Sequence, residues 1–544
     1  MGRHFYLLDW LVLGAYFAAT MGIGFHFHRR SRSTEGFTAG SRSLPGWACG
    51  LSIFATFLSS ISFLAIPGGA YASNWSWFVF SLSLPVATWV AVRWFMPYYR
   101  RSGEVSAYAH LEHRFGPWAR IYASVFYLLT QVARMGTVLY LMALALAMLL
   151  GWDIRAIILV VGASVTVYAF VGGIVAVIWT DALQAIVLMA GALLALGVLL
   201  LGMPEGPGQV FRIAAANGKF SLGGFDASLT DATFWVVLVY GVVINLQNFG
   251  IDQNYVQRYI ASSSDREARR SVWLGGLLYI PVSAVFLLIG TALFAWYQVH
   301  PVDLAEVRHA VAEQKLMTAG ASAGQVERAQ RVKEIEAGLT TKDIGDKVFP
   351  YFIGKRLPPG LTGLLIAAIL AAGMSTVSTS LNSSATLVMT DYYRRFMRPK
   401  ASEAQSMRVL HGATVAWGVV GTAAALLMIN IKGALDTWWA LAGIFSGGMV
   451  GLFLLGLISR RAGNAAAAAG VALGLLVVAW MSLSQMDLWP KAWCHLRNPL
   501  HKYLVIVVGT AIILLAGLVV GLLIPRRRQA ESGDRQCSDH AREG

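Results

Sequence analysis

The chain has 544 residues, of which 56% are hydrophobic and 13% charged, with a mean hydropathy of +0.59 and a formal net charge of +15. This composition excludes a soluble multidomain protein and indicates a polytopic membrane protein whose main partner is the lipid bilayer. The basic residues lie in short clusters between apolar runs, a pattern that orients membrane helices, so no nucleic-acid partner is expected.

Thirteen apolar runs are long enough to be predicted as transmembrane helices, which makes the chain an all-α polytopic membrane protein. The predicted spans are residues 6–27, 44–72, 75–98, 121–150, 157–171, 174–201, 234–260, 272–296, 361–390, 412–431, 438–458, 465–483 and 504–524.

The distribution of basic residues predicts the orientation. With the N-terminus outside, the inner loops carry 22 Arg and Lys residues and the short outer segments carry 8, in accordance with the positive-inside rule. The C-terminus is then cytoplasmic, and residues 529–544 form a short disordered tail. Residues 299–358 are predicted as a long outer loop with one or two surface helices between residues 303 and 336.

The run over residues 361–390 carries a dense patch of hydroxyls. Ala372, Ser375, Ser378 and Thr379 share one helix face, with Thr376 beside them. Hydroxyl oxygens suit a hard cation such as Na+ that must also be released. Small and hydroxyl residues are equally common where membrane helices pack closely, so both interpretations stay open for this run alone.

Two spans are predicted to be broken. In residues 44–72 the sequence Pro67, Gly68, Gly69 interrupts an apolar run, just after several hydroxyls, and in residues 234–260 Gly250 marks a second discontinuity beside polar residues. Two broken helices five spans apart are typical of inverted repeats around a central site, and two ordinary kinks are the alternative.

Two charges lie within predicted spans. Arg134 is near the middle of residues 121–150 and requires an anion, while Asp181 lies one or two turns inside residues 174–201. One interpretation pairs the two as a buried salt bridge. The other assigns Arg134 to a substrate carboxylate, which a guanidinium binds bidentately, and Asp181 to a cation.

Three stretches carry a resemblance to a known family: IDQNYVQRYIA, DKVFPYFIGKRLPPGLTGLLIAAILAAGMSTVSTSLNSSATLVMTDYY and FLLGLISRRAGNAAAAAGVALG. With the first broken helix they span roughly residues 5–470, and they resemble the sodium/solute symporter family, relatives of the sodium/glucose transporters. The resemblance implies a LeuT-type fold of five plus five inverted repeats with broken first and sixth core helices. It places an extra helix and basic loop in residues 1–43, the repeats in 44–203 and 204–458, and two peripheral helices in 459–528.

The resemblance also implies two sodium sites. The site common to the family would use the carbonyls of Ala55, Leu58 and Ala372 and the hydroxyls of Ser375 and Thr376. A second sodium, present in some members, would use Asp181, Ser375, Ser378 and Thr379.

Within the family, the stretch ATFLSSISFLAIPG together with an Arg in the third core helix resembles the bacterial sialic acid transporters. The substrate residues would be Ser59, Ser60, Ser62, Arg134 and Asn248, with Ser81 as a further polar candidate, while the insertion at residues 303–338 is longer than usual for that branch.

The expected function is therefore sodium-coupled import of sialic acid or a similar organic anion through the bacterial inner membrane, not catalysis. The alternatives are a sugar, monocarboxylate or amino-acid symporter in which Arg134 is structural, or a nutrient sensor, which the sixteen-residue tail disfavours.

Overall fold

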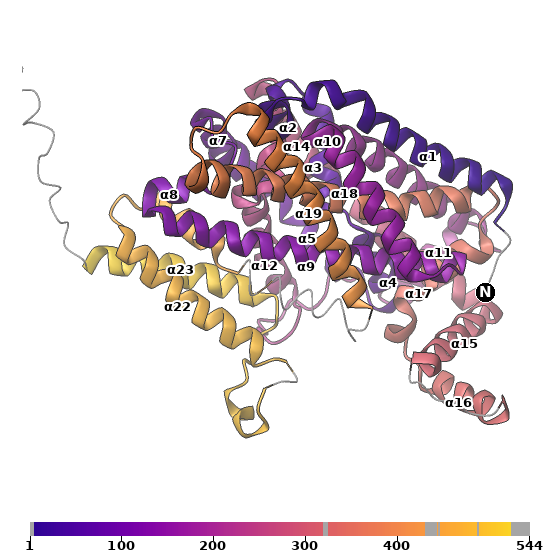
Figure 1. Ribbon diagram of the computed structural model, residues 1–544. Coiled ribbons are helices and arrows are strands. Elements are labelled where there is room, and N and C mark those ends of the chain that lie inside the picture. Colours follow the sequence, from indigo (N-terminus) through magenta and orange to yellow (C-terminus); the bar gives the residue numbers. More distant parts are fainter. Residues whose placement is uncertain (1–4, 319–324, 430–442, 444–446, 487–488, 524–544) are drawn as a thin grey trace, which may run out of the picture.

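The computed structural model describes residues 5–318, 325–429, 443, 447–486 and 489–523 (Figure 1). In this part of the chain the regular structure is all helical apart from one isolated bridge between Leu44 and Ser262. Its first half contains α1 (Leu7–His26), η1 (Phe27–Ser31), α2 (Thr34–Ala39), η2 (Gly40–Arg42), α3 (Gly46–Phe57), α4 (Ser60–Ala72), η3 (Trp75–Trp77), α5 (Phe78–Leu82), α6 (Leu84–Val90), η4 (Ala91–Phe95), α7 (Met96–Ser102), α8 (Ala109–Phe115), α9 (Pro117–Leu150) and α10 (Ile154–Leu201).

The second half contains α11 (Gly208–Ala216), α12 (Phe234–Ile251), α13 (Gln253–Ala261), α14 (Asp265–Val299), α15 (Pro301–Thr318), α16 (Gln325–Gly338), α17 (Thr341–Arg356), α18 (Leu361–Leu387), η5 (Val388–Met397), α19 (Glu403–Met428), α21 (Met449–Ile458), α22 (Asn464–Leu483), η6 (Lys491–Leu496) and α23 (Leu504–Leu523). The all-helical prediction is confirmed.

Ten helices of the described residues are long and apolar enough to cross a membrane, and α3 with α4, bent by 53°, make an eleventh candidate. The predicted spans 412–431 and 438–458 lie partly outside the described residues, as does the tail 529–544 entirely. The count of thirteen spans therefore stays a prediction.

Helix α10 contains both predicted spans 157–171 and 174–201, separated by a sharp break at Gly173 (φ 50°, ψ −150°). Tyr168 donates a hydrogen bond to the Met374 carbonyl (3.2 Å), and the Asp181 carboxylate accepts one from Ser375 (2.7 Å). Tyr168 and Asp181 would lie about 20 Å apart in an unbroken helix. Because they contact consecutive residues of α18, the chain must reverse at Gly173.

The first broken helix is confirmed, but the predicted position of its break was wrong. The helix is interrupted at Leu58 and Ser59, whose backbones are extended, and Pro67 lies inside α4. The glycines near Pro67 permit close packing instead. A Cβ on Gly68 would lie 2.8 Å from the Gly345 carbonyl of α17, and a Cβ on Gly290 of α14 would lie 2.1 Å from the Pro67 carbonyl.

The second break is also present, two residues beyond the predicted Gly250. Asp252 has an extended backbone (φ −76°, ψ 117°) between α12 and α13, and its carboxylate accepts a hydrogen bond from the Asn254 amide (2.8 Å). The carboxylate therefore acts as the N-cap of α13, which explains why the helix restarts there.

Helix α18 forms the centre of the bundle (Figure 1). It packs against α1, α3, α4, α9, α10 and α19, and all its residues except Leu361 and Leu364 are buried. A helix buried all round places its hydroxyls against other protein segments rather than lipid, so each hydroxyl requires a partner within the protein.

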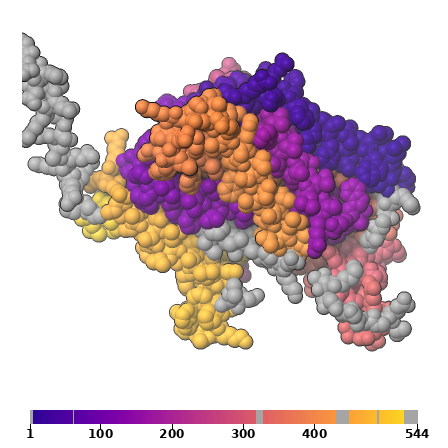
Figure 2. Space-filling view, in the orientation of Figure 1, coloured from indigo at the N-terminus to yellow at the C-terminus, as the bar shows by residue number. Residues whose placement is uncertain are grey.

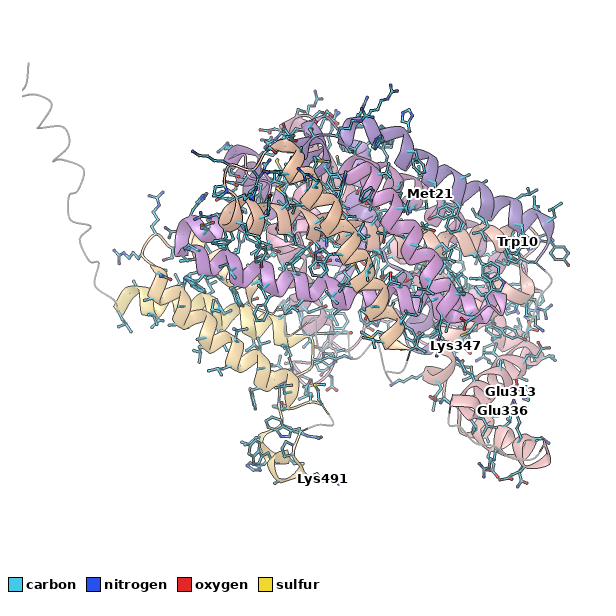
Figure 3. All side chains as sticks on the ribbon, viewed as in Figure 1. Trp10, Met21, Glu313, Glu336, Lys347 and Lys491 are labelled. Atoms are coloured by element: carbon cyan, nitrogen blue, oxygen red, sulfur yellow. The ribbon has the colours of Figure 1, made fainter. Side chains whose placement is uncertain are left out.

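Two segments project from the same side of the body (Figure 2). One is the hairpin of α15 and α16, which contains Glu313 and Glu336, and the other is the connection between α22 and α23, with Lys491 near its tip (Figure 3). The predicted surface helices between residues 303 and 336 are thus present as two helices, and α17 follows as a third.

Candidate functional site

A cavity of 340 Å³ lies beside both helix breaks. Its walls are formed by α3, α4, the third apolar run (residues 75–98), α9, α14 and the residues around the α12–α13 break. Aromatic rings provide much of the apolar surface, namely those of Phe57, Tyr240, Tyr255 and Tyr279. A mostly apolar cavity with a few polar groups is the usual form of a small-molecule site.

Arg134 lies in the wall of this cavity, on α9. One guanidinium nitrogen donates to the Thr56 carbonyl in the last turn of α3 (2.9 Å), and none of the salt bridges among the described residues involves Arg134. The structure thus separates Arg134 from Asp181. The other N–H groups of this planar fork are available for a carboxylate.

Most of the predicted substrate residues come together around Arg134. Ser59, Ser62 and Asn248 line the same cavity, as does Ser81, whose hydroxyl is 2.7 Å from that of Ser283. Ser60 lies outside the lining. Its hydroxyl is buried and donates to the Val138 carbonyl of α9 (3.2 Å).

Asp252 also lines the cavity. The sequence alone indicated only that polar residues lie near this helix break. The cavity therefore contains one cationic and one anionic side chain, Arg134 and Asp252, without a salt bridge of 4 Å or less between them in the described part of the chain.

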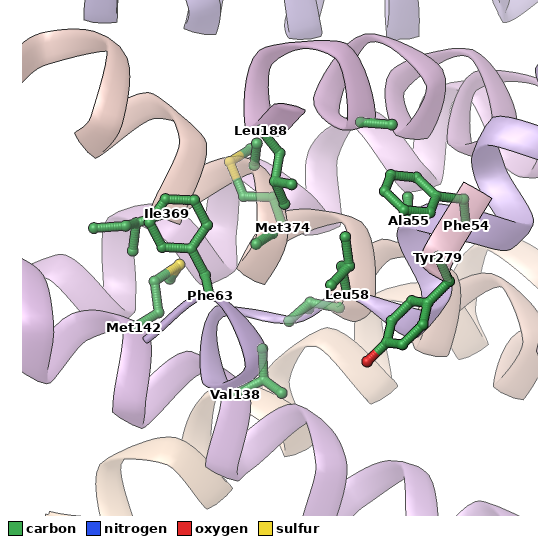
Figure 4. Close-up of a cluster of buried hydrophobic side chains, with 14 of the residues drawn as sticks. Phe54, Ala55, Leu58, Phe63, Val138, Met142, Leu188, Tyr279, Ile369 and Met374 are labelled. Atoms are coloured by element: carbon green, nitrogen blue, oxygen red, sulfur yellow. The ribbon is translucent and has the colours of Figure 1, made fainter. Parts of the chain in front are cut away.

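The residues predicted for the common sodium site lie on two packed segments. Ala55 and Leu58 are at the end of α3, where the helix is interrupted (Figure 4). Ala372 and Thr376 are on α18, which packs against α3. The last carbonyls of a helix lack the usual partner four residues on and point along its axis, although that of Ala55 accepts a hydrogen bond from the Leu58 amide (3.2 Å). The Thr376 hydroxyl donates to the Ala372 carbonyl (3.2 Å), so α18 offers uncharged oxygens, the kind of ligand a hard cation prefers.

The residues predicted for the second sodium site are likewise clustered. The Asp181 carboxylate accepts hydrogen bonds from Ser375 (2.7 Å) and Thr379 (3.5 Å), and the Ser378 hydroxyl donates to the Ser375 carbonyl (3.0 Å). Ser52 of α3 adds a hydroxyl that sequence analysis did not include, 2.6 Å from Asp181.

Arg258, near the end of the predicted span 234–260, is one of the 22 basic residues counted for the inner loops, and that assignment is wrong. The structure buries it completely, with Nη2 3.0 Å from Asp181 Oδ2 and Nε 2.9 Å from the Ser52 hydroxyl. It lies on α13, and every residue of that short helix is buried. The Asp181 charge is therefore compensated by a protein side chain.

The sequence matches one known protein family over most of its length. The model of the sodium:solute symporter family matches residues 37–474. The chain belongs to this family. It is accordingly a sodium-coupled solute symporter and a multi-pass membrane protein, not an enzyme.

Individual relatives include bacterial transporters. The sodium/sialic acid symporter NanT of Aliivibrio fischeri is 33% identical over 483 residues, 88% of each chain. The sodium/sialic acid symporter SiaT of Proteus mirabilis is 30% identical over 540 residues, 98% of this chain and 99% of the relative. A solved structure, described as the substrate-bound outward-open state of a Na+-coupled sialic acid symporter with a novel Na+ site, matches with a TM-score of 0.82 and 28% identity, covering 96% of this chain and 98% of that one.

Proposed function

We propose that this symporter imports a carboxylate-bearing solute, sialic acid or a similar sugar acid, through the bacterial inner membrane, with its N-terminus outside and its C-terminus in the cytoplasm. The observation that carries the proposal is the position of Arg134, in the wall of a cavity that also contains Ser59, Ser62 and Asn248. A guanidinium that forms no salt bridge among the described residues at membrane depth favours a ligand that supplies a carboxylate.

The remaining lining suits a sugar ring. The cavity volume of 340 Å³ is within the range of about 300–1,000 Å³ typical of small-molecule sites. Hydroxyl and amide groups of Ser59, Ser62 and Asn248 pair with sugar hydroxyls, and the rings of Tyr255 and Tyr279 cover apolar faces. The names of the two bacterial relatives agree with this assignment.

Sodium would couple to this cavity through the first helix break. A Na+ ion held by Ala55, Leu58, Ala372, Ser375 and Thr376 links the broken helix to α18, in the arrangement expected of a LeuT-type five-plus-five repeat. The ion favours the conformation whose cavity binds substrate well, and by reciprocity substrate strengthens the binding of Na+.

A second Na+ would occupy Asp181, Ser375, Ser378 and Thr379. Because Arg258 already contacts this carboxylate, the ion must share or displace the guanidinium. Loading of the second site is then tied to a rearrangement of α13, which belongs to the second broken helix.

An amino acid is the second candidate substrate, favoured by Asp252. An α-amino acid carries a carboxylate and an ammonium. Arg134 would bind the carboxylate and Asp252 the ammonium, since both side chains line the cavity.

Uptake into proteoliposomes tests both candidates. Labelled sialic acid, other sugar acids, neutral sugars, monocarboxylates and amino acids are compared with an inward Na+ gradient and with K+ in its place. We expect accumulation of sugar acids only with Na+. Accumulation of amino acids but not sugar acids would replace the first candidate with the second, and the absence of uptake for every organic anion would remove the role of Arg134 in substrate binding.

A further inference from the structure

A second, larger hollow lies away from the transport cavity, on the outside of the bundle. This lateral groove has a volume of 1180 Å³ and shares no lining residue with the cavity around Arg134. It is bounded by α6, η4 and α7 of the third apolar run together with residues of α12, α14 and α21.

The floor of the groove is apolar and its rim aromatic. Aliphatic side chains come from Leu246, Leu454, Leu457 and Ile458. The rings of Trp89 and Trp94 pack edge to face with their centroids 5.1 Å apart, and about half of the surface of each residue is exposed. Exposed tryptophans near the ends of membrane spans are typical of the boundary between acyl chains and headgroups. The π-helical turn η4 (Ala91–Phe95) lies in this wall.

Three arginines surround the groove at one end, and no Asp or Glu lines it. Arg93, Arg101 and Arg269 are exposed, and none of them takes part in a salt bridge among the described residues. Two of their acidic neighbours are paired with other arginines.

Those neighbours are Asp265, which pairs with Arg100, and Glu267, which pairs with Arg270 at 2.8 Å. Glu104, three residues after Arg101, forms no salt bridge among the described residues, so three arginines face one nearby carboxylate and the rim has an excess of positive charge next to an apolar floor.

We propose that this groove binds an anionic glycerophospholipid. The phosphate of the headgroup would lie between Arg93, Arg101 and Arg269, and the acyl chains would follow the aliphatic floor. A basic pocket between membrane helices on the cytoplasmic side has the chemistry that recognises anionic headgroups. Arg101 and Arg269 belong to segments predicted to be cytoplasmic, and Arg93 lies near the same end of the predicted span 75–98. A freely soluble anion would gain nothing from the floor or from the exposed tryptophans.

Native mass spectrometry of the detergent-solubilised protein tests this binding. Phosphatidylglycerol and phosphatidylethanolamine with the same acyl chains are offered at equal concentration, and we expect the parent to retain phosphatidylglycerol with at least a tenfold preference. The variant Arg93→Gln, Arg101→Gln, Arg269→Gln should lose that preference. The matched control, Arg29→Gln, Arg32→Gln, Arg398→Gln, removes three exposed arginines that neither line the groove nor adjoin a lining residue in sequence, and it should keep the preference.

Two further measurements separate the possible ligands. Inorganic phosphate in excess should leave the retained lipid in place. Leu457→Trp, which fills the floor of the groove without changing its charge, should lower lipid retention. This variant still tests the proposal if the triple variant does not fold. Equal retention of the two lipids by the parent, an unchanged preference in the triple variant, or displacement by inorganic phosphate would each overturn the proposal. None of these measurements depends on the transported solute.

Discussion

Arg258 and Asp181 form a salt bridge of 3.0 Å in which neither side chain has solvent-exposed surface. The two residues belong to α13 and to the second half of α10, and Ser52 of α3 contacts both of them. Three segments that line or adjoin the candidate ion sites are thus connected through a single buried pair.

Asp181→Asn should destabilise the protein and also alter its response to Na+. Removing one partner of a buried pair leaves the other charge uncompensated, which costs about 3–5 kcal/mol. Thermal unfolding in detergent should show this loss, and the Hill coefficient for Na+ in uptake should fall towards one.

The double variant Asp181→Asn, Arg258→Met separates the two effects, because it removes both charges. It should recover most of the stability but not the cooperativity for Na+. A Hill coefficient that stays at two or above in both variants would eliminate Asp181 as a sodium ligand.

Arg134→Ala should nearly abolish uptake of acidic substrates. Loss of a charged partner from a buried recognition site typically costs about 2–5 kcal/mol, so affinity should fall by about 30-fold or more. Na+ should still stabilise this variant against heat, since Arg134 is not among the proposed sodium ligands. Arg155→Ala, an exposed arginine at the start of α10, is the control and should transport normally. Unchanged uptake by Arg134→Ala would make Arg134 a structural residue.

Ser375→Ala should weaken Na+ binding more than any other hydroxyl substitution in α18. Its hydroxyl contacts Asp181 and belongs to both predicted sodium sites. Ser384→Ala provides the matched control, because Ser384 is buried on the same helix and its hydroxyl has no hydrogen-bond partner among the described residues. Na+ titration by thermal shift should give a clearly higher apparent Kd for Ser375→Ala only, and equal Kd values in the two variants would contradict both site assignments.

The attachment of the hairpin of α15 and α16 should weaken at acid pH. Burial acts to raise the pKa of Asp303, but hydrogen bonds from Arg356 and Trp296 outweigh it and hold this pKa below its usual value. The stabilisation is therefore fully present above the unfolded pKa of about 3.9 and is lost as the pH falls through the lower, folded pKa.

Hydrogen exchange of α15 measures this effect. At pH 6, Asp303→Asn should exchange faster than the parent, and below about pH 3 the difference should shrink as the parent carboxylate is protonated. Glu313→Gln, at an exposed position of the same helix, is the control. A difference that persists at the lowest pH would show that Asp303 acts through packing rather than charge.

Much of the site was predictable because charge and polarity are costly inside a membrane. Arg134 and the hydroxyls of α18 stood out for that reason, and the structure places Arg134 with Ser59, Ser62 and Asn248. Arg258 was missed because it lies near the end of an apolar run, where an arginine normally extends to the interface. Only the tertiary fold brings it to Asp181.

The position of the first break was also not predictable from local sequence. Proline and glycine are the usual signals of an interrupted helix, yet Pro67 is accommodated within α4. The actual break at Leu58 and Ser59 contains neither residue type. A residue on another helix stabilises it: Arg134 of α9 donates a hydrogen bond to the Thr56 carbonyl. Local sequence cannot reveal this contact, because the two residues are 78 positions apart.

Gly173 has a consequence for how the chain enters the bilayer. The chain reverses there without a polar connecting loop, so the apolar segments on either side have no charged residue between them that could anchor one segment before the other is made. We therefore expect the two halves of α10 to leave the translocation machinery together, as a preformed hairpin. A side chain at this position would meet the ring of Phe37 at 2.8 Å, so a substitution there would impair biogenesis before any transport could be measured.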